Sequence, residues 1–151
     1  MTRPSFTRLV ALGAALFGLA ESQPARAASK THRISFHVDR NEPATMNLAL
    51  NNATNVSTFY SGIGDPIEIE FVAYGPGLHM FRVDTSPVKD RLKSIKESIP
   101  DIVFSACGVT KTAMEKAEGH PIALVTQARV VPAGVVRLTE LQEAGWTYIK
   151  P

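Results

Sequence analysis

Alternating and continuous apolar runs predict five strands. In residues 31–39, Ile34, Phe36 and Val38 alternate with polar side chains, which is the two-residue period of a half-buried strand. Residues 67–74 are rich in Ile, Phe, Val and Tyr and end at a glycine turn. A wholly apolar run at 102–104 continues to Cys107, as expected for the buried middle of a parallel sheet. The last two strands are predicted at the following short runs: 128–131 and 146–149.

Two longer stretches between these strands have helical periodicity. In residues 44–60 the apolar side chains recur at spacings near 3.6, and Pro43 suits a first helical turn. A stripe of asparagines follows the same helix: Asn47, Asn51 and Asn55. Such a stripe is typical of a solvated face or of hydrogen bonding across an interface. Residues 88–99 are the clearest amphipathic helix, with Ser86 predicted as the N-cap and Pro87 as the first helical residue.

Two shorter helices complete the alternation. Thr112 and Glu115 fit a capping box, and Gly119 is a stop signal, which together predict a helix near 113–118. The last helix is predicted over residues 134–144. Strands that alternate with helices are joined by right-handed crossovers and lie parallel. The sequence therefore predicts a three-layer α/β/α domain with a mainly parallel five-stranded sheet.

Composition limits the classes of partner. The chain has 151 residues, enough for one domain, and 44% of them are apolar, which excludes a disordered chain. The formal net charge of +2 arises in the first 27 residues, which hold three arginines and one glutamate. The remaining residues have no net charge, so neither nucleic acid nor a membrane surface is expected as a partner.

The N-terminus has the three parts of a secretory signal peptide. Arg3 and Arg8 precede an apolar run at 9–20, which is too short to span a bilayer, and an A-x-A pattern ends at Ala27. We expect a signal peptide over 1–27, cleaved after Ala27 or Ala28, and a mature domain over 28–151 in the periplasm. An uncleaved anchor or a buried helix is the alternative.

Cys107 is the single cysteine, so an intramolecular disulfide is excluded. In an oxidising compartment a lone thiol is buried and inert, paired between chains, or kept for reaction. Its place at a strand-to-helix turn favours the thiolate, although a helix that begins only near residue 113 would weaken this effect. A buried structural cysteine is an equally good interpretation.

The predicted topology gathers the candidate residues at one rim. Ligand sites in open parallel sheets lie beyond the carboxyl ends of the strands. The residues expected there, with substrate-binding roles beside a catalytic Cys107, are His37, Gly75, Gly77, His79 and Gly108. The glycines would leave room for a ligand and the histidines could move protons, although packing explains such residues at least as often.

Other chemistries have little support in the sequence. It contains no G-x-S-x-G elbow and no C-x-x-C pair, which argues against a serine hydrolase and a thioredoxin-like enzyme. The four histidines lack metal-ligand spacing. We therefore predict neither a metal nor a cofactor.

Several segments, in the expected order, resemble the DsrE/DsrF-like (YchN-like) sulfur-relay proteins. They are 71–78, 103–108, 131–136, 141–146 and 148–151. The resemblance implies a five-stranded parallel sheet and a homotrimer or homohexamer. It also implies that Cys107, which matches the family cysteine, carries sulfur as a persulfide.

These observations lead to two hypotheses of function. In the first, the chain is a periplasmic sulfur carrier, at most sulfurtransferase-like, that exchanges sulfane sulfur with polysulfide or with a donor or acceptor protein through Cys107. In the second, it is a non-catalytic oligomeric binding or scaffold protein with a structural cysteine.

Overall fold

The computed structural model describes residues 29–151, and the predicted signal peptide lies outside them. Five strands form one sheet in the order β4-β3-β2-β1-β5, and every pairing between them is parallel. The strands are β1 (His32–Val38), β2 (Ile67–Ala73), β3 (Val103–Cys107), β4 (Ala128–Val131) and β5 (Thr147–Ile149). The predicted parallel sheet is confirmed.

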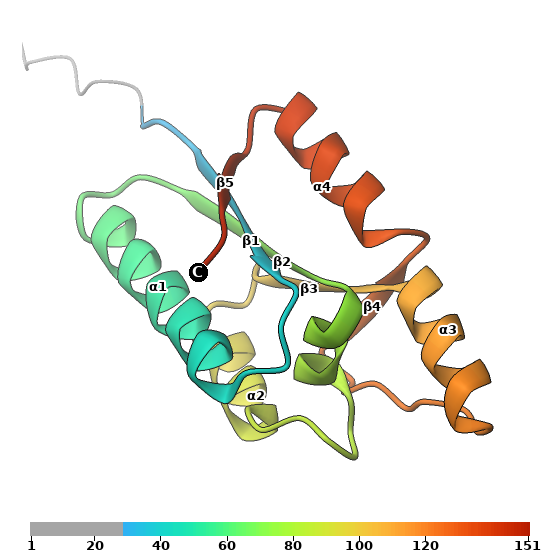
Figure 1. Cartoon of the computed structure of the whole chain (residues 1–151). Coiled ribbons are helices and arrows are strands. Elements are labelled where there is room, and N and C mark those ends of the chain that lie inside the picture. Colours follow the sequence, from blue (N-terminus) through green and yellow to red (C-terminus); the bar gives the residue numbers. More distant parts are fainter. Residues whose placement is uncertain (1–28) are drawn as a thin grey trace, which may run out of the picture.

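Helices cover both faces of the sheet, as the three-layer prediction requires. The described helices are α1 (Pro43–Gly62), the 3-10 helix η1 (Gly75–Phe81), α2 (Lys89–Ser98), α3 (Gly108–Glu118) and α4 (Gly134–Glu143). Figure 1 shows α1 and α2 on one side of the sheet and α4 on the other. No helix in residues 29–151 has the length and apolar character needed to cross a membrane.

The two faces of the sheet differ in chemistry because side chains alternate along each strand. On the α1/α2 face, Phe36, Phe71 and Phe104 lie on adjacent strands with ring centroids 5.0 and 5.4 Å apart. These rings are fully buried in the main core. On the α4 face the alternate positions are largely polar and include the buried Glu70 and Ser105. The apolar cluster between α4 and this face is small.

The chain reverses direction across the sheet after β4. Successive crossovers place β1, β2, β3 and β4 side by side, whereas α4 leads back to β5 at the opposite edge. The connection that leaves β3 leads to its edge neighbour β4, whereas the connection that leaves β4 runs back toward the opposite edge. Ligands in open parallel sheets bind beyond the carboxyl ends of the strands, and Cys107 ends β3 at this rim.

Two predicted helix starts were wrong. The helix predicted near 113–118 begins at Gly108, directly after β3, with Cys107 as its N-cap. The capping-box glutamate, Glu115, instead forms an ion pair with Lys111 and accepts a hydrogen bond from the amide of Ile122. Similarly, α2 begins at Lys89 rather than at Pro87. The Ser86 hydroxyl donates to the carbonyl of Met80 and accepts a hydrogen bond from the amide of Val88, just before the helix.

The asparagine stripe of α1 joins two helices. Arg91 of α2 donates to the side-chain oxygen of Asn51 at 2.7 Å and to that of Asn47. For Asn47 and Asn51 the stripe therefore serves hydrogen bonding across an interface, and that interface is the contact between α1 and α2 of the same chain. These bonds help to fix α1 against α2.

Gly77 is required by a close backbone contact. A Cβ at this position would lie 2.1 Å from the carbonyl oxygen of Val38 at the end of β1. The backbone of η1 can therefore pack on β1 only if residue 77 has no side chain.

We predict that Gly77→Ala lowers the free energy of unfolding by at least about 2 kcal/mol, since backbone must move to admit the methyl group. Gly62→Ala is the matched control, because a Cβ there meets nothing within 4 Å. Chemical denaturation of both variants measures the difference. Equal stability of the two would show that the contact with Val38 relaxes without cost.

Candidate functional site

Cys107 lines a cavity at the point where the chain reverses direction. Its side chain is only 4% exposed, yet it belongs to the wall of a hollow of about 370 Å³. The other lining residues are Tyr74, Val109, Thr110, Ala133, Gly134 and Val135. The volume lies within the usual range for small-molecule sites. The thiol is therefore buried beside a cavity and not sealed within the core.

The first turns of two helices meet at this cavity. Gly108 begins α3 and Gly134 begins α4, and the Val109 amide bonds to the carbonyl of Pro132, which ties the start of α3 to the end of β4. A Cβ on Gly134 would lie 3.0 Å from the Tyr74 ring and 3.2 Å from the Cys107 Cβ. Glycine at 134 thus brings the amide end of α4 close to the thiol.

The sulfur environment favours the thiolate. The Thr110 amide donates to Cys107 Sγ at 3.5 Å. Burial raises the pKa of the Cys107 thiol, but hydrogen bonds from the Thr110 side chain and from the amides of Gly134, Thr110 and Val109 outweigh burial, so the pKa lies below its usual value. Because α3 begins at Gly108 and not near residue 113, the Val109 and Thr110 amides belong to its first turn. The Gly134 amide comes from the start of α4.

The predicted glycines lie at the rim but have packing roles. Gly108 approaches the Val131 carbonyl, from which a Cβ would be 3.0 Å away. Gly75 has a left-handed φ of 52°, and its amide donates to Thr110 Oγ1 at 3.0 Å. Gly77 contacts β1 as described above. None of the three lines the Cys107 cavity, and their predicted role in substrate binding stays a prediction.

The predicted histidines are not bonded to the thiol. His79 lies in η1, where its Nδ1 bonds to Thr85 Oγ1 at 2.7 Å. His37 is buried on the α4 face, with its Nδ1 2.7 Å from the Tyr148 hydroxyl and its ring 4.4 Å from that of Tyr74. Burial lowers the pKa of His37, and the nearby Asp39 only partly counters this effect. Tyr74 thus touches His37 on one side and Gly134 beside the thiol on the other.

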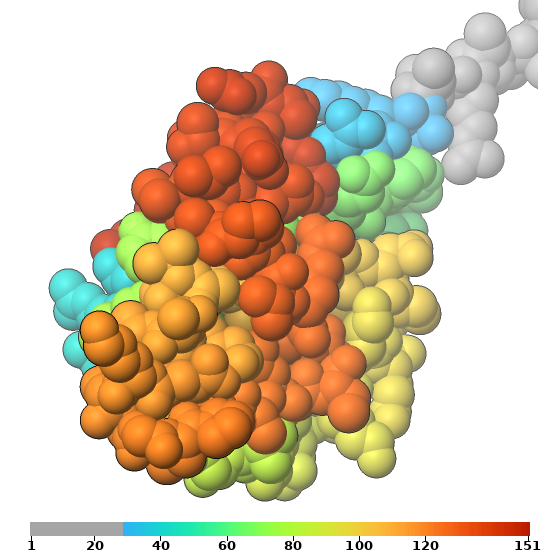
Figure 2. All heavy atoms as spheres, turned by 90° about the vertical axis from the view of Figure 1, so that its right-hand side faces the viewer, coloured from blue at the N-terminus to red at the C-terminus, as the bar shows by residue number. Residues whose placement is uncertain are grey.

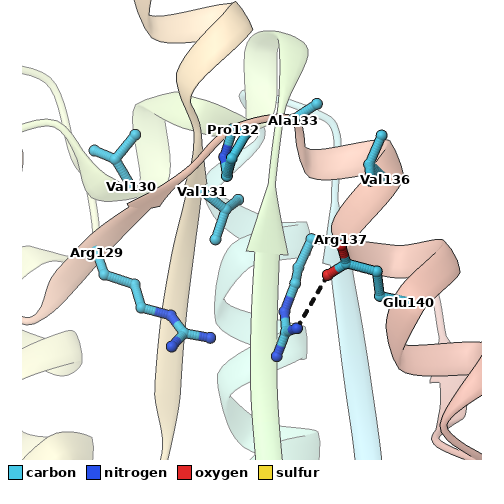
Figure 3. A pocket seen from close by; sticks show the side chains of 8 residues that line it. All are labelled: Arg129, Val130, Val131, Pro132, Ala133, Val136, Arg137 and Glu140. Carbon is cyan, nitrogen blue, oxygen red and sulfur yellow. Dashed lines mark hydrogen bonds and ion pairs between the residues drawn. The ribbon is translucent and has the colours of Figure 1, made fainter.

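A buried ion-pair network lies on the same face, next to the cavity. Glu70 is 1% exposed and accepts from Arg137 at 2.7 and 2.8 Å, from Arg129 at 3.1 Å and from the Ser105 hydroxyl at 2.7 Å. Figure 3 shows Arg129 of β4 and Arg137 of α4 extending toward each other across the sheet. Burial raises the pKa of Glu70, but these donors outweigh burial and hold it below its usual value.

This network fixes the position of α4 over the sheet. Arg137 belongs to the first turns of α4, and Gly134 precedes it by one helical turn. The small apolar cluster beneath α4 includes Leu138 and Leu141. The Glu70–Arg137 pair therefore adds a directional contact that positions the amide end of α4 against Cys107.

Sequence patterns missed two residues that complete the site. Tyr74 looked like the end of a strand and Gly134 like an ordinary helix start. The amides of Val109 and Thr110, which directly follow Cys107 in the sequence, were already candidates to favour the thiolate. Glu70 carried a signal, since a charged residue in the middle of a predicted buried strand requires a partner. Within residues 29–151 no group of three or more His, Cys, Asp or Glu side chains could hold a metal ion.

Comparison with known proteins supports the fold. No protein-family model and no curated protein matches the chain. The chain is similar to the solved structure of MTH1491 from Methanobacterium thermoautotrophicum, a protein of unknown function, with a TM-score of 0.66 and 27% identity. The match covers 80% of this chain and 99% of MTH1491. The domain is thus an α/β protein of the same general architecture as MTH1491.

We predict that Glu70→Gln destabilises the fold by about 3 kcal/mol at neutral pH, because it leaves Arg137 without its buried partner. The folded-state pKa of Glu70 is depressed, so its contribution is present above the unfolded pKa and is lost as pH falls through the folded value. The stability difference from wild type should shrink in acid. Chemical denaturation at neutral and acidic pH measures it.

Glu68→Gln on the same strand is the control. Glu68 pairs with Arg33 where both side chains are 46% exposed, and such pairs contribute at most about 1 kcal/mol. A loss for Glu70→Gln no larger than for Glu68→Gln would contradict the structural role of the buried network.

Proposed function

We propose that this protein carries sulfane sulfur as a persulfide on Cys107. The observation that supports this function best is the thiol at the N-cap of α3, which lines a cavity of about 370 Å³ and accepts a hydrogen bond from the Thr110 amide. Donors directed at a sulfur favour the thiolate, which is the nucleophilic form of cysteine. A purely structural cysteine requires neither an adjoining cavity nor donors directed at its sulfur.

The carrier cycle needs no external oxidant or reductant. The Cys107 thiolate attacks the outer sulfur of a donor persulfide, R–S–SH, and the donor sulfur–sulfur bond breaks, which releases R–S⁻ and forms Cys107–S–SH. An acceptor thiolate then attacks the outer sulfur, takes it as a new persulfide and returns the bonding electron pair to Cys107 Sγ. An inorganic polysulfide serves as a donor by the same displacement.

The resemblance to the DsrE/DsrF-like family supports this proposal from a separate direction. The segments that carry it fall on β2 and the start of η1, on β3 with Cys107, and on the β4–α4 and α4–β5 connections. The first three of these regions supply cavity-lining residues, namely Tyr74, Cys107 and residues 133–135, whereas the α4–β5 segment does not. The signal-like N-terminus adds the proposal that the carrier works in the periplasm, where its partners differ from those of cytoplasmic relays.

A non-catalytic scaffold of the same fold is the second candidate. The 4% exposure of Cys107 favours it, because reagents and partners reach the sulfur only through the cavity. The two functions differ in whether the folded protein lets a sulfur donor reach the thiol.

We predict that polysulfide adds the mass of one sulfur atom to the folded protein and that Cys107→Ser abolishes this addition. Intact-mass measurement records the product, and an added small thiol should remove the extra sulfur. The chain has no other cysteine, so Cys107→Ser is a complete control. A wild-type protein that takes up sulfur only after denaturation would contradict the carrier function and favour the scaffold.

We also propose that the protein associates with itself through the surface beside the cavity. Figure 2 shows this side, with α4 in red above α3 in orange. Four valines from β4 and from the starts of α3 and α4 are more than half exposed there: Val109, Val130, Val135 and Val136. Within residues 29–151, β4 is also an unpaired edge of the sheet. Apolar side chains at a free sheet edge favour association, and the family resemblance implies a trimer or hexamer.

We predict that Val130→Lys shifts the protein toward the monomer, because a lysine on an edge strand opposes edge-to-edge contact. Ile63→Lys is the control, since Ile63 is 57% exposed and lies at the end of α1 rather than beside β4. Light scattering after size-exclusion chromatography measures the mass. A wild-type monomer, or an equal effect of both variants, would contradict association through this surface.

A further inference from the structure

His37 is a buried histidine with one bonded and one unbonded ring nitrogen. The residue is 4% exposed. Its Nδ1 lies 2.7 Å from the Tyr148 hydroxyl, whereas Nε2 is buried and has no hydrogen-bond partner among residues 29–151. A neutral imidazole carries one N–H group, but a protonated imidazole donates from both nitrogens. Whichever tautomer is present at neutral pH, a charged His37 would therefore hold a buried N–H group at Nε2 without an acceptor.

Apolar and aromatic groups lie around the ring. In the parallel sheet His37 is paired in register with Val72, which is fully buried on the same face. The centroid of the Tyr74 ring lies 4.4 Å from that of the His37 ring. Both Val72 and Tyr74 belong to the apolar cluster beneath α4. A charge in such surroundings costs free energy unless it is paired and hydrogen-bonded, so the site favours the neutral ring.

The charged groups nearby do not supply the missing acceptor. Asp39 favours the charged ring and Lys150 opposes it, and these two side chains form an ion pair with each other. Glu70 of β2 and Arg137 of α4 lie further down the same face and are bonded to each other. The phenols of the two tyrosines beside the ring carry no charge in acid. Burial outweighs the attraction of Asp39, so the pKa of His37 lies below its usual value.

The bonded nitrogen of His37 helps to hold the C-terminal strand. β5 has three residues and, among residues 29–151, pairs only with β1 at the edge of the sheet. Figure 1 shows β5 beside β1, at the end of the connection from α4. Three side-chain bonds reinforce the pairing: His37 with the Tyr148 hydroxyl, Ser35 with the Thr147 carbonyl, and Lys150 with Asp39. Short edge segments with few contacts open locally at a lower free energy than the core.

We propose that His37 is an acid-sensitive tie between β1 and the C-terminal strand, and that protonation of its ring releases β5 while the rest of the sheet stays folded. When β5 moves away, water can accept the hydrogen bond from Nε2. The open form therefore binds the proton more tightly than the closed form, and acid shifts the population toward the open form. This behaviour requires no sulfur chemistry at Cys107.

Trp146 provides the measurement, because it is the single tryptophan of the chain. It directly precedes β5 and packs on the apolar cluster beneath α4. The pKa of His37 is depressed in the closed form, so the closed form is fully favoured above the ordinary value of about 6.5 and loses stability as the pH falls below it. We expect the Trp146 emission to shift to longer wavelength in this range, while the far-ultraviolet circular dichroism keeps most of its amplitude.

The ion-pair network does not produce the same response. The pKa of Glu70 lies below its usual value, so Glu70 is protonated only in stronger acid than His37. A loss of circular dichroism in step with the emission shift would show global unfolding and would overturn the proposal.

Two variants separate His37 from the other histidines. His37→Phe keeps an aromatic ring that takes up no proton, and it should abolish the emission shift. His120→Gln is the control, because the His120 side chain is 54% exposed beside Glu118 at the end of α3, and it should leave the shift unchanged. An emission shift that persists in His37→Phe would overturn the proposal.

The wild-type protein provides a test that does not depend on any variant folding. Nuclear magnetic resonance titration follows each imidazole separately, and the chain has four histidines. We expect the His37 midpoint to lie below about 6.5 and to coincide with the Trp146 shift. A midpoint at or above that value, or a Trp146 emission that stays constant while His37 titrates, would overturn the proposal.

Discussion

The hydrogen bond from the Thr110 amide to the Cys107 sulfur links the sheet to the helix that follows it. The sulfur takes the place of the side-chain oxygen that usually caps a helix, so α3 begins at Gly108 without an intervening loop. The amides of the first turn then face the thiol, together with those at the start of α4. Thus one contact both starts the helix and sets the electrostatic environment of the sulfur.

The two faces of the sheet have different roles: one carries the main apolar core, and the other carries the polar groups that position α4. Phenylalanines from β1, β2 and β3 pack against one another on the α1/α2 face and form a continuous core. The α4 face holds a buried glutamate and its two arginines, with only a small apolar cluster under α4. Because directional ion pairs hold α4, its position over the sheet is defined. The start of α4 lies against the Cys107 side chain.

Close backbone packing at the carboxyl rim explains how the thiol can be both buried and adjacent to a cavity. Gly108 fits against β4, and Gly134 fits between Tyr74 and Cys107. These contacts bring the starts of α3 and α4 together around the sulfur and leave the hollow beside it. The exposed valines around this region give the rim an apolar surface, which suits contact with another protein surface.

The carboxyl-rim rule located Cys107 from the sequence, whereas the contacts around it came from the tertiary structure. The rule depends only on the order of strands and helices, which the apolar periodicity showed. It could not show that Cys107 itself caps α3, because the capping-box pattern at Thr112 and Glu115 was a competing local signal. The contact of Val109 with Pro132 joins residues that are distant along the chain, and it favoured the earlier helix start.

The sequence by itself determined the alternation of strands and helices, the parallel sheet and the place of the single cysteine at a strand end, because these follow from short-range periodicity. The tertiary structure decided which face of the sheet is polar, which residues donate to the sulfur and why the rim glycines are needed. Gly75 and Thr110 are 35 residues apart, as are Glu70 and Ser105. Such pairs meet only when crossovers bring separate strands together, and no local pattern encodes their distance or direction.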